Sequence, residues 1–286
     1  MGREKLNELF AGRKLVIATK HGKESVLKPL FDKELGVKSE LVEGLDTDLL
    51  GTFSGEIERT LDPISTARRK CELAMDLTGA DLALASEGSF GAHPSAFFLP
   101  ANEEWLLFWD RKNQLEIHAR HLSMETNFAG QDFSDLNTLE DFAQKALFPS
   151  HGLILRNQQD SNLEIYKGIT DQSLLLELGE QLLKKYGNAY VETDMRAHLN
   201  PTRMKVIKET AQKLLEKIRS CCPSCSLPGF AVVSAEPGLP CSWCGTPTRS
   251  ILFQTKTCTH CGHSEQVHFP QGKTREDPMY CDHCNP

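Results

Sequence analysis

Residues 80–94, ADLALASEGSFGAHP, decide how the rest of the chain is interpreted. Leu82 to Ala85 form a short apolar run, and Gly88 and Gly91 follow it. Such a run is typical of a strand that is buried on both faces inside a parallel sheet. Glu87 would then lie just beyond the carboxyl end of this strand, where open α/β sheets bind their ligands. The alternative is a plain strand-ending turn in which Glu87 is solvated.

A second buried strand is expected near the start of the chain, at residues 15–19 (LVIAT). A short polar loop follows it, and then an amphipathic helix that stops at Gly36. Backbone N–H groups at the start of such a helix favour an anion, and Lys20, His21 and Lys23 add positive charge there. The alternative is an ordinary solvated loop, because the sequence has no glycine-rich phosphate-binding motif at this point.

A similar junction is expected between a short strand and a helix around residues 193–203. Asn200 is a favourable N-cap and Pro201 suits the first position of a helix. Arg196, His198 and Arg203 would therefore gather at a helix N-terminus, which again favours an anion. The alternative is local capping and surface ion pairing.

The remaining hydrophobic patterns predict further strands and helices, with a polar loop at residues 46–62. Residues 103–110 and 115–119 should form a β-hairpin. Cys71, on the apolar side of a helix, is expected to be a small core residue. The other expected elements are strands at residues 39–42, 152–156 and 189–192 and helices at residues 63–78, 139–147, 173–186 and 201–218.

These patterns predict two domains, which is reasonable for 286 residues. We expect residues 1–219 to form an α/β domain with a mixed, mainly parallel sheet flanked by helices, with Thr19 and Glu87 at its carboxyl edge. Residues 220–286 should form a small double zinc-ribbon domain.

The second domain is predicted from four CxxC pairs. Each pair presents two thiolates to one tetrahedral metal, so four pairs supply eight ligands for two structural zinc ions. Sequential pairing, first with second and third with fourth, is the default, although nested or cross-braced pairing fits the spacing equally. Cys221 is either a spare thiol or an alternative to Cys222, and His260, His263 and His283 are not needed as ligands. The eight predicted ligands are Cys222, Cys225, Cys241, Cys244, Cys258, Cys261, Cys281 and Cys284.

Composition limits the remaining possibilities. The net charge of −7 argues against nucleic-acid binding driven by the charge of the whole protein. The start of the sequence has no apolar core of signal-peptide length, and no run approaches the ~18 apolar residues of a membrane helix. We therefore expect a cytoplasmic protein without a membrane partner. The oligomeric state is not readable from the sequence.

Several motifs together resemble a bacterial family, the domain of unknown function numbered 6671 (DUF6671). They extend over nearly the whole chain and are IATKHGKE, GLDTDLLGTF, GADLALASEGSFGAHP, SMETNF, FPSHGLILR, KGITD, VETDMRAHLNPTRM, GLPCSWCGTPT and DPMYCDHCNP. A more distant resemblance links ATKHGKE and ASEGSFG to the Gly-Lys loop and acidic loop of inosine/xanthosine triphosphate pyrophosphatases (ITPases). A second acidic motif and a nucleobase pocket of that group are not recognised.

The ITPase resemblance implies an α/β fold and, with Mg²⁺ as a catalytic cofactor, hydrolysis of a nucleotide or another phosphoanhydride. Cations would bind the phosphates and a carboxylate would hold the metal. On this hypothesis Glu87, Lys23 and His198 are catalytic, and either Glu58 or Asp62 supplies a second carboxylate. The substrate would be bound by Thr19, Lys20, His21, Ser89, Arg196, Asn200 and Arg203.

Two other functions remain open at this stage. The protein could be a non-catalytic binding protein whose zinc ribbons dock on nucleic acid or on a protein partner. Alternatively, the ribbons could only brace the α/β domain.

Overall fold

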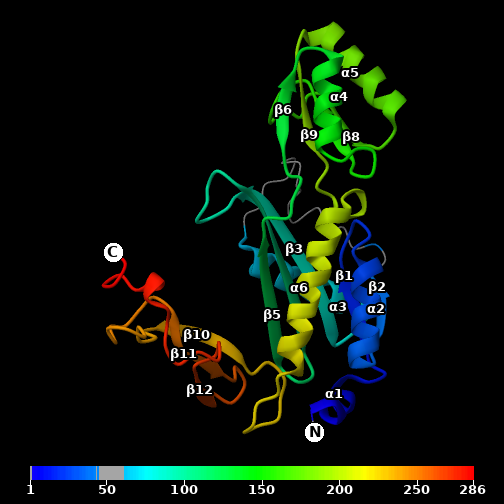
Figure 1. Ribbon diagram of the computed structural model, residues 1–286. Coiled ribbons are helices and arrows are strands. Elements are labelled where there is room, and N and C mark those ends of the chain that lie inside the picture. Colours follow the sequence, from blue (N-terminus) through cyan, green and yellow to red (C-terminus); the bar gives the residue numbers. More distant parts are fainter. Residues whose placement is uncertain (1, 43, 45–60) are drawn as a thin grey trace. The chain divides into compact units, whose positions relative to one another are not determined.

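The computed structural model describes residues 2–42, 44 and 61–286 (Figure 1). The chain divides into two compact units, Phe10–Leu215 and a smaller one that joins the residues up to Leu9 to Glu216–Pro286. Within the described residues, no helix is long and apolar enough to cross a membrane.

The larger unit contains a mixed five-stranded sheet in the order β2-β1-β3-β4-β5. Strand β1 pairs in parallel with both β2 and β3, whereas β4 and β5 add antiparallel neighbours. The predicted buried strands and the predicted hairpin are confirmed, because residues 15–18 of β1 and 82–88 of β3 are buried and β4 turns directly into β5. The strands are β1 (Lys14–Ala18), β2 (Lys38–Leu41), β3 (Leu82–Ala92), β4 (Pro100–Asp110) and β5 (Leu115–Ser123).

Strand β3 does not end at Ala85, so the predicted polar loop at its carboxyl end is wrong. The strand continues to Ala92 and pairs with β4 along its whole length, with Glu87 opposite Trp105 and Gly88 opposite Glu104. The backbone hydrogen bonds of the antiparallel neighbour outweigh the weak strand preference of the Gly and Ser residues. Glu87 is consequently a buried strand residue, neither in a loop nor solvated.

Helices cover both faces of this sheet (Figure 1). On one face lies α3 (Pro63–Thr78), whose first turn is capped by Asp62 and whose Cys71 packs in the core as predicted. On the other face lie α2 (Glu24–Leu35), whose Phe31 ring stacks on Phe108 of β4, and α6 (Pro201–Arg219). Odd-numbered residues of β3 and β4, such as Ala83 and Leu107, face α3, and even-numbered residues face α2 and α6.

The larger unit also contains a second, four-stranded antiparallel sheet in the order β6-β9-β7-β8. Its helices, α4 (Leu136–Lys145) and α5 (Gln172–Tyr186), pack on one apolar core with it. The prediction that all upstream strands share one mainly parallel sheet is therefore wrong. The strands are β6 (Gly130–Phe133), β7 (Leu153–Arg156), β8 (Ile165–Ile169) and β9 (Ala189–Thr193).

The smaller unit is built on a three-stranded antiparallel sheet in the order β10-β11-β12. Its elements are α1 (Gly2–Phe10), β10 (Ala231–Pro237), β11 (Ile251–Thr257), β12 (Ser264–His268) and a short helix at Pro278–Tyr280. Nearly all residues of the three strands are exposed or half-buried. The largest buried groups outside α1 and α6 are cysteines, Phe230 and Leu239, so this unit has little apolar core of its own.

Candidate functional sites

Eight cysteines of the smaller unit form two groups of four that could each hold a metal ion. Within each group the ligand atoms all lie within 4.8 Å of one another. The closest Sγ–Sγ distances are 3.6–3.9 Å, which fits the edge of about 3.8 Å in a tetrahedron with Zn–S bonds of about 2.3 Å. The groups are Cys222, Cys225, Cys258 and Cys261, and Cys241, Cys244, Cys281 and Cys284.

The pairing of the CxxC turns is cross-braced, so the sequential default is wrong. The first pair joins the third and the second joins the fourth. The sheet explains this, because the start of β10, the end of β11 and the start of β12 lie together, with Ala231 opposite Thr257 and Thr257 opposite Ser264. The first and third pairs flank that end of the sheet, whereas the second and fourth follow the ends of β10 and β12.

Hydrogen bonds already favour thiolates at two of the exposed ligands. Donation from Thr246 lowers the pKa of Cys244 to about 6, and donation from the backbone N–H of His263 lowers the pKa of Cys261 to about 7. In contrast, burial raises the pKa of Cys225 to about 12. Without a metal the four thiols of a group therefore do not ionise together, and a metal ion would replace the remaining protons.

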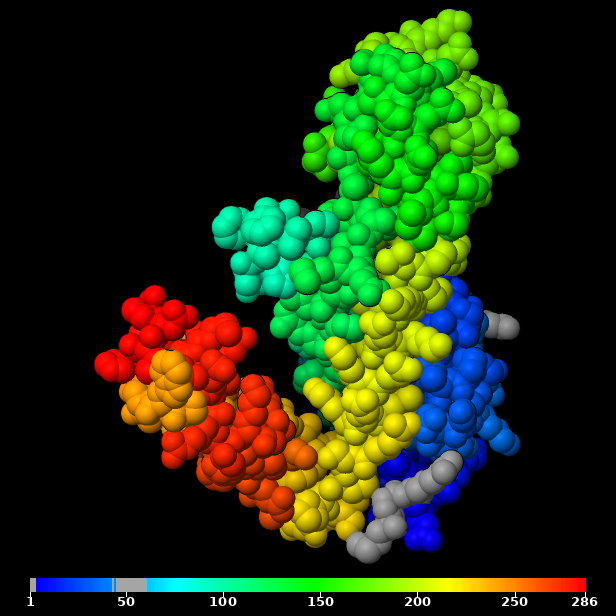
Figure 2. Space-filling model, viewed as in Figure 1, coloured from blue at the N-terminus to red at the C-terminus, as the bar shows by residue number. Residues whose placement is uncertain are grey.

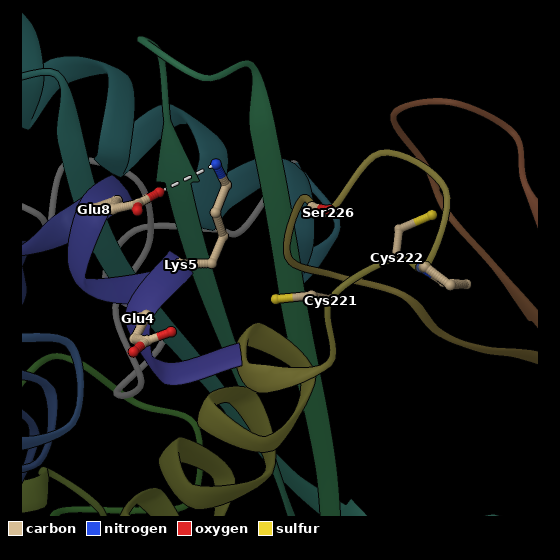
Figure 3. A pocket seen from close by; sticks show the side chains of 7 residues that line it. Glu4, Lys5, Glu8, Cys221, Cys222 and Ser226 are labelled. Atoms are coloured by element: carbon tan, nitrogen blue, oxygen red, sulfur yellow. Dashed lines mark hydrogen bonds and ion pairs between the residues drawn. The ribbon is translucent and has the colours of Figure 1, made fainter. Parts of the chain in front are cut away.

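Cys221 belongs to neither group, which agrees with its expected role as a spare thiol. Its side chain points toward α1 while that of Cys222 points the other way (Figure 3). It lines a pocket of about 310 Å³ together with Glu4, Lys5 and Glu8. None of the three nearby histidines belongs to a described metal group, and His263 instead lies 3.0 Å from Glu265.

A second candidate site lies in the larger unit, where α2 begins after β1. Lys23 is 5% exposed, and its Nζ donates a hydrogen bond of 2.8 Å to Oγ of Ser86 on β3. Burial, together with the positive charge of Arg203, lowers the pKa of Lys23 to about 7. Among the described residues, no carboxylate forms an ion pair with this amine.

The junction that precedes α6 lies against the start of α2. The rings of His21 and His198 stack with centroids 5.4 Å apart, and a Cβ on Gly22 would lie 3.2 Å from Cβ of His198. The first turns of α2 and α6 line a pocket of about 630 Å³ with Lys205 and Lys208 at its edge. In Figure 2 these yellow turns of α6 lie beside the blue α2.

Arg203, one turn into α6, is wholly buried and fixes this junction to the sheet. Its Nε donates a hydrogen bond of 2.7 Å to Oε1 of Glu104, and its Nη1 donates to the carbonyl of Met195. Asn200 acts as the predicted cap, because its Oδ1 accepts from the backbone N–H of Arg203. A Cβ on Gly88 would lie 2.4 Å from Nη2 of Arg203, so only glycine fits opposite Glu104.

Several predicted site residues lie elsewhere. Glu87 points to the opposite face of the sheet and forms an ion pair with Lys70 of α3. Arg196 is held by buried Asp194, with Nη2 and Oδ2 2.6 Å apart. His198 lines the pocket at the starts of α2 and α6, whereas Lys23 is buried against Ser86, and Glu87 and Arg196 form ion pairs elsewhere. The residues expected to share one cleft therefore do not line it together.

The other predicted residues are placed as follows. Thr19 and Lys20 directly follow β1, and Thr19 Oγ1 donates to the carbonyl of Lys20. Ser89 lies on the α3 face with its Oγ 3.5 Å from Oε2 of Glu103. Asp62 is occupied as the cap of α3, and Glu58 lies outside the described residues.

Comparison with a family model places residues 70–286 in the family described as a domain of unknown function, DUF6671. The chain belongs to this family. Among curated proteins the comparison found no match. The solved structures that resemble this DUF6671 chain include the crystal structure of protein VC0702 from Vibrio cholerae, with 10% identity and a TM-score of 0.31. That match covers 72% of this chain and 94% of the other, and a TM-score this low carries no argument about fold or function.

The two cysteine groups predict how many zinc ions the chain binds and how that number changes when one ligand is removed. We expect about two zinc ions per chain, and Cys258→Ser should reduce this to one because a three-thiolate site binds zinc more weakly. Cys221→Ser is the matched control and should retain two. Elemental analysis of reduced protein measures this, and a zinc content near zero with disulfides present would contradict the assignment.

The burial of Lys23 predicts that the stability of the fold depends on pH. Its folded-state pKa of about 7 lies below the ordinary value of 10.5, so the buried ammonium destabilises the fold fully below pH 7 and progressively less as pH rises toward 10.5. Lys23→Met should therefore raise the melting temperature more at pH 6 than at pH 9.5. Exposed Lys28, on the same helix, is the control, and equal effects of the two substitutions at both pH values would contradict the assignment.

Proposed function

We propose that the larger unit binds a phosphorylated small molecule at the junction of α2 and α6, while the smaller unit folds around two structural zinc ions as a double zinc ribbon. The observation that supports the ligand site best is the buried amine of Lys23, whose one hydrogen-bond partner among the described residues is a neutral serine. A buried cation without a counter-ion is costly, and a bound anion would remove that cost.

The surrounding charges favour an anion. On this face of the sheet the buried cations are Lys23 and Arg203, and the buried carboxylate of Glu104 is paired with Arg203. The charge of Glu87 also acts on Lys23, although Glu87 is paired with Lys70 on the opposite face. The starts of α2 and α6 add the partial positive charge of two helix N-termini. A phosphate group would accept hydrogen bonds from all of these donors.

The same geometry favours binding over Mg²⁺-dependent hydrolysis. Hydrolysis of a phosphoanhydride needs a carboxylate that is free to hold the metal. Glu87 is paired with Lys70, and Asp62 accepts from the first turn of α3. The hydrolase hypothesis thus rests on the sequence resemblance, whereas the binding hypothesis rests on the positions of charged groups.

The smaller unit does not favour nucleic acid as a partner. The part of this unit that holds both cysteine groups, residues 220–286, contains four Lys and Arg residues against five Asp and Glu residues. Each zinc ion bound by four thiolates would add a formal charge of −2. Because nucleic-acid binding depends on positive charge, this unit suits a structural role or a protein partner better.

Titration with inorganic tripolyphosphate tests the proposal. The wild-type protein should bind it near pH 6.5, where Lys23 can hold a proton, and Lys23→Met should weaken binding by about tenfold or more. Lys28→Met is the control for lost surface charge and should bind as the wild type does. Phosphate release in the presence of Mg²⁺, followed in parallel, tests hydrolysis.

Two results would contradict the proposal. One is the absence of tripolyphosphate binding by folded wild-type protein. The other is an equal loss in the two lysine variants, which would indicate nonspecific attraction to the surface.

A further inference from the structure

Two polar side chains of β4 are buried without satisfying their hydrogen-bonding groups. Asn102 is 0% exposed, and neither its Oδ1 nor its Nδ2 has a hydrogen-bond partner among the described residues. Glu104 is 1% exposed, and its Oε2 has no partner there either, although Oε1 accepts from Arg203. Buried polar groups are nearly always paired, so three unpaired atoms two residues apart require an explanation.

These atoms lie in line with the proposed phosphate site. Asn102 and Glu104 are even-numbered residues of β4, opposite Phe90 and Gly88, on the sheet face that carries Ser86. Ser86, which contacts Lys23, is opposite Leu106. Asn102 is therefore about 14 Å further along the strand, at about 3.4 Å per residue.

The charge of the buried side chains differs between the two ends of this row of residues. The amine of Lys23 favours phosphate at one end. Further along the strand, the guanidinium of Arg203 is paired with Glu104 and lies over the ring of Phe90, opposite Asn102, so the two charges there balance. The free oxygen of Glu104 accepts hydrogen bonds only. The amide of Asn102 offers one acceptor and two donor hydrogens. An occupant at that end must be uncharged and must itself carry both donors and acceptors.

We propose that Asn102 and Oε2 of Glu104 bind the uncharged polar part of the ligand whose phosphate lies near Lys23. This inference rests on the proposed phosphate site and extends it to a specificity for organic phosphates. The ligand is a phosphate ester whose organic part presents a donor to Glu104 and a donor and an acceptor to Asn102. Inorganic polyphosphates offer acceptors and negative charge alone, so they satisfy only the Lys23 end.

Sugar hydroxyls and a nitrogen heterocycle both offer uncharged hydrogen-bond donors and acceptors. Pairs of organic and inorganic probes distinguish these two possibilities. Ribose 5-phosphate compared with inorganic phosphate tests hydroxyl groups. The four ribonucleoside triphosphates compared with tripolyphosphate test a base together with its ribose. We expect the wild-type protein to bind at least one organic probe about tenfold more tightly than its inorganic counterpart.

Asn102→Ala identifies the residue responsible. It should abolish the preference for the organic probe and leave the affinity for the inorganic counterpart unchanged. The melting temperature should hold or rise, because Asn102 loses no hydrogen bond in the absence of ligand. Asn157→Ala is the matched control, since its Oδ1 is likewise buried without a partner but belongs to the loop after β7 of the other sheet.

The outcomes separate this inference from the proposed function. If tripolyphosphate binds through Lys23 but no organic probe is preferred, the inference is wrong and the phosphate site stands. If Asn102→Ala lowers the melting temperature markedly, or weakens organic and inorganic probes equally, Asn102 is structural and the inference is again wrong. If no phosphate compound binds, the proposed function fails and the inference with it.

Discussion

The buried ion pair between Arg203 and Glu104 is the constraint on which the larger unit depends. Both side chains are almost fully excluded from water, and they join the first turn of α6 to strand β4 of the five-stranded sheet. Removing one partner of such a pair leaves an uncompensated buried charge, so the pair restricts where α6 can lie. Because α6 is held there, His198 contacts the start of α2, and two helix N-termini that are far apart in sequence meet.

That arrangement explains why Lys23 is in an unusual environment. A lysine at the start of a helix normally reaches solvent, but α2 and α6 enclose this one against Ser86. The positive charge of Arg203 then adds to the cost of burial. The fold thus creates a cationic site that is stable only with a deprotonated amine or with an anion beside it.

The sequence predicted the parts of this structure that depend on local pattern. The apolar runs LVIAT and LALA are buried strands, and the CxxC spacing identified all eight cysteines that gather in the metal groups. The capping residue Asn200 and the start of α6 were also predictable, because N-cap chemistry is local.

The parts that depend on distant contacts were not predictable. Strand β3 extends through Gly88 only because β4 pairs with it. The pairing of the CxxC turns follows from the order of β10, β11 and β12. Asn102, Glu104, Leu106 and Phe108 are every second residue of β4 and so lie on one face of the sheet. This alternation with two apolar residues was the one signal in the sequence that Asn102 and Glu104 face inward. Glu87 was expected just beyond the end of its strand, but it lies within β3 and pairs with Lys70 on the face opposite that of Ser86, because successive strand residues point to opposite faces.

The central claim is that Lys23 is a buried amine that an anionic ligand completes. Titration of its Nζ by ¹⁵N NMR, with and without tripolyphosphate, tests this most directly. The account predicts a pKa of about 7 in the free protein and a clear upward shift when tripolyphosphate is bound. An ordinary lysine pKa in the free protein, or a low pKa that tripolyphosphate leaves unchanged, would contradict it.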